Sequence, residues 1–283
     1  MKNILAIISD PANSKEFIKY TYQMAKELNY SPHFLYIQDP TISAMSSGAI
    51  RPGANPIGTE IETDRKNAIR LIQEKIRKVR KELSNDVLFN FNVETGFVVN
   101  VINQYISSKK AEMVVLEGRD KTGAWTFDAS NSDIIQKINC PGWMIPYRSG
   151  YDPYHKIVYA TDYNETDVNT LKNLVNLTGR FSPEITALHI SDSIDFEEKT
   201  KEKGFIEIVR KELEYDKIQV KTIVDKGKKG PGENINNYAT DNGANLIVLL
   251  KENVNFIEKI FKPEQTKKVL KTAKLPVLVY QEQ

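Results

Sequence analysis

The residue types that most often carry chemistry are sparse in this chain of 283 residues. Its three histidines, His33, His155 and His189, are dispersed, and the sequence has no His-x3-His pair or Cys–His cluster. We therefore expect no metal site. The single cysteine, Cys140, precedes Pro141 at the entrance of an apolar run, where a packing role is more common than nucleophilic chemistry. Local spacing yields no nucleophile–base pair or carboxylate pair, so we predict no catalytic residues and no enzyme activity.

One glycine-rich segment, residues 227–232, superficially resembles a phosphate-binding loop. It lacks the spacing Gly-x4-Gly-Lys-Ser/Thr, and Pro231 removes one backbone donor. A solvated turn is the simpler interpretation, and an anion site is the alternative. No Gly-x-Gly-x-x-Gly motif follows an apolar run, which disfavours a dinucleotide-dependent dehydrogenase.

Two aspartates stand at the ends of apolar runs. Asp10 follows residues 4–9, and Asp162 follows residues 157–161. A carboxylate in this position can accept hydrogen bonds from a ligand or from the backbone of its own turn. Both roles are open for Asp10, whereas the local turn role is the favoured interpretation for Asp162.

These aspartates belong to an internal repeat, because five landmarks occur in the same order in both halves. The matched segments are 4–10 with 157–162, 35–39 with 188–192, 102–105 with 235–238, 113–116 with 246–249 and 140–145 with 275–280. The first half carries extra residues between its second and third landmarks. The segment from Pro40 to Thr59, rich in Ser, Gly and Pro, fits this excess and is expected to form a loop. We predict two tandem domains, residues 1–149 and 150–283.

The elements alternate between short apolar strands and amphipathic helices in both halves. A capping pair, Asn13 with Glu16, is expected at the start of the first helix. The alternation predicts an α/β protein of two doubly wound, Rossmann-like parallel-sheet domains, in which ligands bind at the carboxyl ends of the strands. Strands are expected at 3–9, 33–38, 87–95, 112–117, 142–147, 156–161, 184–191, 217–225, 245–250 and 276–280, and helices at 14–29, 60–83, 98–109, 131–139, 165–178, 196–214, 232–242 and 257–273.

Overall composition excludes several classes of protein. The formal net charge of +2 is too balanced for a dedicated nucleic-acid surface. No apolar run approaches the length of a membrane helix, and the N-terminal run is shorter than the core of a secretory signal. We expect a cytoplasmic protein without nucleic-acid or membrane partners.

The ordered landmarks resemble the universal stress protein family over nearly the whole chain. Both halves have a strand ending in Asp, a second strand ending in an aliphatic residue with a polar–Asp tail, and a final strand announced by Pro. The resemblance implies an adenine nucleotide alpha hydrolase-like fold in tandem. It also implies an intramolecular pseudo-dimer in which Trp143–Ile145 and Val277–Val279 form the pairing edges. Many members of the family bind ATP.

The resemblance assigns Asp10 and Ile37 to the adenine position of the first copy. In the family a Gly-x2-Gly-x9-Gly-Ser/Thr segment then wraps the phosphates. Gly118 and Ser132 match its first and last positions, while Lys121 and Asn131 stand where glycine is expected. Lys121 could substitute a side-chain charge for a backbone donor.

The second copy departs further from the family pattern. Asp162 and Ile190 keep the adenine positions, but residues 251–268 contain no glycine, which disfavours close backbone approach to a triphosphate. We therefore expect the nucleotide site to be lost in the second copy and degenerate in the first.

Three functions remain open. The first is a non-catalytic cytoplasmic stress-response or regulatory factor that requires no cofactor. The second is an ATP-binding protein or slow ATPase that uses the first domain only. The third is an interaction scaffold with another small ligand, protein partners or a homodimer, for which the segment from Pro40 to Thr59 beside the site is the motivating feature.

Overall fold

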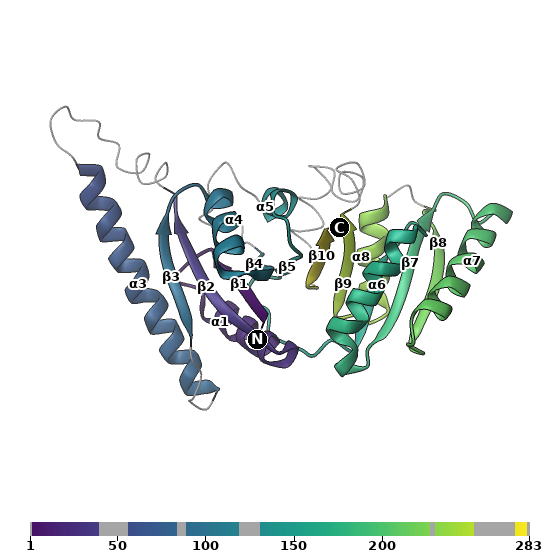
Figure 1. Cartoon of the computed structure of the whole chain (residues 1–283), viewed down its shortest axis with the longest axis horizontal. Coiled ribbons are helices and arrows are strands. Elements are labelled where there is room, and N and C mark those ends of the chain that lie inside the picture. The colour runs from purple at the N-terminus through teal and green to yellow at the C-terminus, as the bar shows by residue number, and fades with distance from the viewer. Residues whose placement is uncertain are drawn as a thin grey trace. The chain divides into compact units, whose positions relative to one another are not determined.

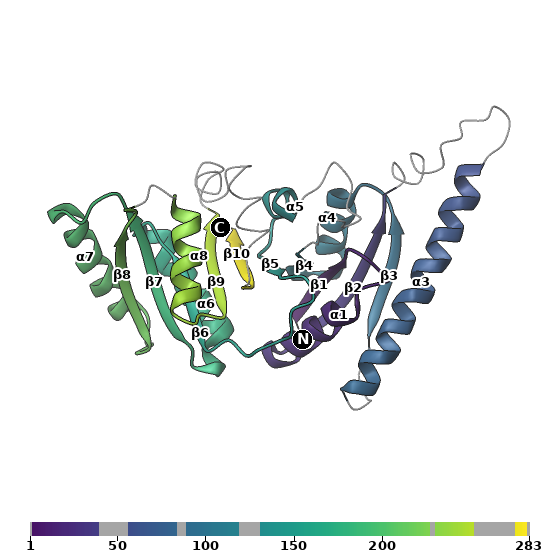
Figure 2. The ribbon, with the colours of Figure 1, turned by 180° about the vertical axis from the view of Figure 1, so that it is seen from behind.

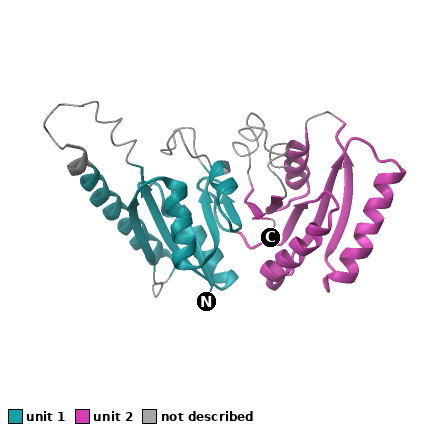
Figure 3. Cartoon of the chain, turned by 45° about the horizontal axis from the view of Figure 1, so that its top comes forward, with its two compact units in different colours: residues 1–151 teal, residues 152–283 magenta. Residues whose placement is uncertain are grey.

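The computed structural model describes residues 2–39, 56–83, 89–118, 131–226, 230–251 and 275–281, with the side chains of residues 56–60 and 132 excepted. The chain divides into two compact units, residues 1–151 and 152–283 (Figure 3). Each unit has its own set of parallel strands with helices packed on them.

The first unit has the strand order β3-β2-β1-β4-β5, and all of its strand pairs are parallel (Figure 1). The order reverses at β1, which lies between β2 and β4. The carboxyl end of β1 is therefore the switch point at which such sheets bind ligands. Its described elements are β1 (Lys2–Ile8), α1 (Lys15–Leu28), β2 (Tyr30–Gln38), α3 (Pro56–Glu82), β3 (Asn90–Thr95), α4 (Val98–Lys109), β4 (Ala111–Glu117), α5 (Asn131–Lys137) and β5 (Gly142–Ile145).

The second unit repeats this topology as β8-β7-β6-β9-β10. Helix α6 lies in front of its sheet in Figure 1 and α8 in Figure 2, so the two helices cover opposite faces. Its described elements are β6 (Lys156–Ala160), α6 (Glu165–Thr178), the 3-10 helix η1 (Gly179–Phe181), β7 (Glu184–Ser191), α7 (Phe196–Glu212), β8 (Ile218–Val224), α8 (Pro231–Asp241), β9 (Leu246–Lys251) and β10 (Val277–Gln281).

Buried aliphatic runs and one-sided helices build the core. The β1 residues from Ile4 to Ile8 are at most 2% exposed, as expected for a central strand covered on both faces. Helix α3 buries Ile72, Ile76 and Val79, which lie on one helical face. The basic residues of the same helix, from Lys75 to Lys81, are half-buried or exposed, as a solvated face requires.

The predicted α/β fold is confirmed, and each described strand and α-helix lies within a few residues of its expected range, whereas the 3-10 helix η1 was not expected. The helix expected at 257–273 lies outside the described residues. The expected loop ends earlier than predicted, because Pro56 to Thr59 already belong to α3, where proline is tolerated in the first turn. The rest of that loop, residues 40–55, is also outside the described part.

The predicted capping role of Asn13 is wrong. Ser14 is the N-cap of α1, and no side chain caps the helix. The Asn13 amide instead donates to the carboxylate of Asp10 at 2.6 Å. None of the described helices combines the length and the hydropathy needed to cross a membrane.

Candidate functional site

Asp10 lies at the switch point of the first unit, directly beyond β1. One of its carboxylate oxygens accepts the backbone N–H of Ala12 at 2.8 Å, and the other accepts the Asn13 amide. Asp10 therefore has the local turn role that the sequence left open, because it accepts hydrogen bonds from its own turn. Ile37, on the neighbouring strand β2, is 9% exposed. Strands β1 and β2 pair in parallel, with Ile8 opposite Tyr36, so Asp10 and Ile37 lie at adjacent strand ends.

Tyr36 adds a half-buried phenol to this edge that the sequence did not single out. Burial raises the pKa of the Tyr36 hydroxyl, and the negative charges of Asp64 on α3 and of Asp10 raise it further. The carboxyl edge of β1 and β2 is therefore electronegative.

Gly118, the first predicted phosphate-loop residue, follows β4 and lies against β5. Its N–H donates to the carbonyl of Ile145 at 2.5 Å. A Cβ at this position would lie 3.1 Å from the same carbonyl oxygen and 3.3 Å from the Tyr147 nitrogen. The close approach of the two strand ends thus favours glycine at position 118. The Gly118 N–H is already hydrogen-bonded within the protein.

Asn131, which stands where the family pattern has glycine, begins α5. Its side-chain Nδ2 donates to the carbonyl oxygen of Glu117 at 2.8 Å and so ties the start of α5 to the end of β4. Ser132 is the second residue of α5, and its side chain is not among those described. Lys121 also lies outside the described residues. Four of the predicted site residues thus lie at strand ends or at the start of the helix that follows β4: Asp10, Ile37, Gly118 and Asn131.

Glu117 is a further residue of this edge that sequence reasoning missed. It closes β4 and is only 2% exposed. Burial raises its pKa to about 7, although hydrogen bonds from the Arg148 backbone and the Ser9 hydroxyl act in the opposite direction and the Asp10 charge raises it further. The feature of the sequence that could have indicated Glu117 is an acidic residue directly after the apolar run 113–116.

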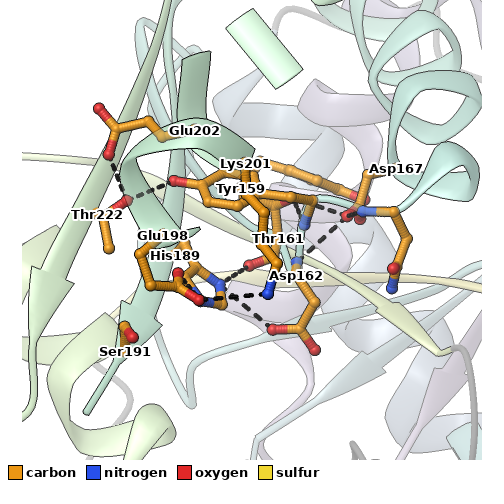
Figure 4. A network of polar contacts seen from close by, with 12 residues as sticks. Tyr159, Thr161, Asp162, Asp167, His189, Ser191, Glu198, Lys201, Glu202 and Thr222 are labelled. Carbon is orange, nitrogen blue, oxygen red and sulfur yellow. Dashed lines mark hydrogen bonds and ion pairs between the residues drawn. The ribbon is translucent and has the colours of Figure 1, made fainter. Parts of the chain in front are cut away.

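Asp162, the counterpart of Asp10, has a different role in the second unit. Its carboxylate oxygen lies 3.4 Å from Nδ1 of His189 on β7, and Nε2 of the same ring lies 3.4 Å from Glu198 on α7 (Figure 4). Nδ1 is also 2.8 Å from the carbonyl oxygen of Thr161. Burial lowers the pKa of His189, but its contacts with Asp162, Thr161 and Glu198 outweigh burial, so the net pKa is raised.

The turn role predicted for Asp162 belongs instead to Asp167. The Asp167 side chain is 2% exposed and takes part in a capping box at the start of α6. Its carboxylate accepts the Tyr159 and Thr161 hydroxyls at 2.5 and 2.7 Å (Figure 4). It also accepts the backbone N–H groups of Asp162 and Asn164 at 3.2 and 3.0 Å. The turn role predicted for Asp162 is therefore wrong, because Asp167 fills it. The acidic residue three positions after Asn164 is the feature of the sequence that could have indicated this.

Tyr163 lies over the carboxyl ends of the strands in the second unit. Its backbone has a left-handed φ of 62°. Its ring centroid lies 4.8 Å from that of His189 and 5.1 Å from that of Phe205 on α7. The Tyr163 hydroxyl and the Thr222 hydroxyl on β8 are 2.7 Å apart, and Thr222 in turn donates to Glu202. The tyrosine is therefore held at both its ring and its hydroxyl.

The two units differ in what fills this edge. In the second unit the space beside β7 and β8 is taken by the Tyr163 side chain. At the matching position of the first unit stands Pro11, whose side chain is smaller and carries no aromatic ring. Tyr36 occupies the position that matches His189.

The other candidates of the sequence have structural roles. Cys140 is buried, and burial raises the pKa of its thiol to about 12, which suits a packing residue. In the glycine-rich segment the Gly230 N–H donates to the Asp225 carboxylate at 2.9 Å, while residues 227–229 are outside the described part. Among the described residues, no three His, Cys, Asp or Glu side chains are grouped so that they could hold a metal ion.

Comparison with known proteins gives consistent matches. Residues 153–281 match the model of the universal stress protein family. The chain is similar to the universal stress proteins MJ0531 and MJ0577 of Methanocaldococcus jannaschii, at 27% identity to each. These matches cover 47% and 44% of this chain and 85% and 94% of those proteins.

A solved universal stress protein from Archaeoglobus fulgidus is similar over both units. It has a TM-score of 0.68 and 13% identity, and the match covers 99% of this chain and 98% of that one. At this identity the likeness concerns the fold, which both units share.

Proposed function

The chain belongs to the universal stress protein family in a tandem arrangement, and on this premise we propose that it is a stress-response or regulatory factor. It acts without catalysis and senses a ligand in its first unit only. The ligand is an adenine-type compound held near Asp10 and Ile37. The second unit supports the fold and binds no such ligand.

The observation that carries this proposal is the position of the Tyr163 ring. In the second unit it packs on His189 and Phe205 at the strand ends that correspond to the adenine position. The Asp162 carboxylate, the counterpart of the adenine-contacting Asp, is paired with His189. A ligand would have to displace the ring and separate this pair before it could bind.

The first unit has no aromatic ring at the position that matches Tyr163. Pro11 replaces the tyrosine, and Asp10 retains acceptor capacity because an ionised carboxylate accepts about four hydrogen bonds and two are used locally. The absence of a nucleophile–base arrangement around Asp10 in the sequence supports a non-catalytic role.

Isothermal titration calorimetry of the full chain with adenosine and adenine nucleotides tests this proposal. We expect one site per chain. Asp10→Asn should weaken binding at least about tenfold, because the amide keeps the shape of the side chain but loses the charge that favours a donor group. Asp162→Asn is the matched control in the other unit and should leave the affinity unchanged.

Two results would count against the proposal. Equal losses in both variants, or a stoichiometry of two, would contradict the assignment to one unit. Release of inorganic phosphate from ATP that is abolished by Asp10→Asn would favour the alternative function, a slow ATPase of the first unit.

A further inference from the structure

The end of β4 in the first unit holds a buried carboxyl group with unused acceptor capacity. Glu117 accepts the Ser9 hydroxyl at 3.3 Å through Oε2 and also accepts the Arg148 backbone N–H. Its other oxygen, Oε1, is buried and has no hydrogen-bond partner among the described residues. A buried acceptor without a donor is costly, so such an atom is a candidate contact for a ligand.

A second unused acceptor belongs to Asn131, whose side chain is hydrogen-bonded to the backbone of Glu117. Asn131 donates Nδ2 to the Glu117 carbonyl oxygen, which can only accept, so the orientation of the amide follows from this bond. The remaining atom, Oδ1, is buried and likewise has no hydrogen-bond partner in the part of the chain that the structure describes. Two residues joined by this hydrogen bond, Glu117 and Asn131, therefore each carry an acceptor that lacks a donor.

Two donors described in this region are already engaged. The Gly118 N–H is bonded to Ile145. The Arg148 guanidinium donates to Oδ1 of Asn13 at 2.8 Å and lies 4.9 Å from the centroid of the Tyr147 ring. The Asp10 carboxylate adds a negative charge that acts on Glu117. The two side chains described where the family pattern begins its phosphate-binding segment, Glu117 and Asn131, thus each offer an acceptor, and Asp10 adds a negative charge.

This arrangement is the reverse of what a phosphate needs. Phosphate groups bind where backbone N–H groups or cationic side chains converge, and a carboxylate beside them repels them. A sugar hydroxyl or an amino group, by contrast, could donate to Oε1 of Glu117 or to Oδ1 of Asn131 and would remove the cost of leaving them unpaired.

We propose that the first unit selects an unphosphorylated nucleoside of the adenosine class over its 5′-phosphates, and that Glu117 is the residue that sets this preference. The inference rests on the proposed function and names its ligand class. Glu117 acts on the ligand directly, by accepting a donor and by repelling an anion.

The preference is expected to depend on pH. The pKa of Glu117 is about 7, so the carboxyl is largely neutral at pH 6 and largely ionised at pH 8. The groups facing it are the Ser9 hydroxyl, the Arg148 backbone and side chain, and the Asp10 carboxylate. Discrimination against phosphate should therefore be stronger at pH 8 than at pH 6.

Calorimetric titration of the full chain with adenosine, AMP and ATP at pH 6 and pH 8 tests the inference. At pH 8 adenosine should bind at least about tenfold more tightly than either nucleotide. Glu117→Gln should reduce this ratio and remove its change with pH. Glu112→Gln, at an exposed carboxylate of the same strand that pairs with Lys2 at 2.7 Å, should leave the ratio as in the wild type.

The order of affinities of the wild-type protein for adenosine, AMP and ATP tests the inference even if Glu117→Gln fails to fold. Nucleotides that bind as tightly as adenosine at pH 8 would overturn the inference while leaving the proposed function in place. No binding of any of the three compounds would overturn the proposed function and this preference together. A ratio that Glu117→Gln leaves unchanged would remove Glu117 as its cause.

Discussion

At the scale of single residues, the buried carboxyl group of Glu117 makes a sharp prediction about stability. Its pKa in the folded protein is about 7, against 4.5 for the free side chain. The folded state therefore binds the proton more tightly than the unfolded state. The stability that this group contributes is present below about pH 4.5 and is lost as the pH rises towards 7.

We expect Glu117→Gln to be more stable than the wild type at pH 8, by up to about 3 kcal/mol from the size of the pKa shift. At pH 4.5 the two proteins should be nearly equal. Urea unfolding at both pH values measures this difference, with Glu112→Gln as the exposed control. A variant that is less stable than the wild type at pH 8 would show that the hydrogen bonds from Ser9 and Arg148 outweigh burial.

Residue types at strand ends could be predicted from the sequence, but their partners could not. The sequence located Asp10 and Asp162 at matching positions, and both lie there. It could not show that Asp167 would take over the turn of Asp162, because that choice depends on which carboxylate the buried Tyr159 hydroxyl reaches. Glu117 was missed because a single acidic residue in an apolar run gives no periodic signal.

At the scale of elements, helix α7 is attached to its sheet in two different ways. Its buried apolar residues, Phe205 and Val209, lie in the second half of the helix. The first half is held by polar contacts, from Glu198 to His189 and from Glu202 to Thr222. Only the first of these contacts involves a group that titrates near neutral pH.

The attachment of the first half of α7 should therefore weaken as the pH rises. His189 has a raised pKa, so the stability from its protonated form is fully present below its ordinary value of 6.5 and is lost above the raised value. Hydrogen exchange of the amides of residues 199–204, corrected for intrinsic rates, should show less protection at pH 8.5 than at pH 5.5. His189→Gln should abolish the difference, whereas Thr222→Val should lower protection equally at both pH values.

Element type and order could be predicted because the periodicity is strong in both halves. The strands are uninterrupted aliphatic runs, and a helix such as α3 carries its apolar stripe at regular spacing. Helix starts were less predictable. Asn13 has the right residue type for a cap, but its amide bonds to Asp10 instead, and Pro56 starts α3 inside a segment whose composition is typical of a loop.

At the scale of the whole molecule, the pairing of the closing strands of the two units stays a prediction. Within its own unit β5 pairs with β4 and ends the strand order, so no described strand of that unit covers its other edge, which carries apolar Trp143 and Met144. Such an edge favours association with another strand. The first unit expressed alone, residues 1–151, should therefore form dimers or larger species.

Light scattering coupled to size-exclusion chromatography measures this association. The full chain at the same concentration is the reference, and it should show a smaller tendency to associate than the isolated unit. An isolated first unit that stays monomeric would contradict the predicted pseudo-dimer.

Gly142, the first residue of β5, has a consequence for the history of the two copies. A Cβ at this position would lie 1.8 Å from Cδ1 of Ile135 on α5, so a side chain cannot be added unless the Ile135 side chain moves. The matching residue of β10 is Val277. Recombination between the duplicated halves at this strand would place a branched residue against Ile135. The copies thus differ at a buried position, and the strand of one copy would fit the other only after Ile135 repacks.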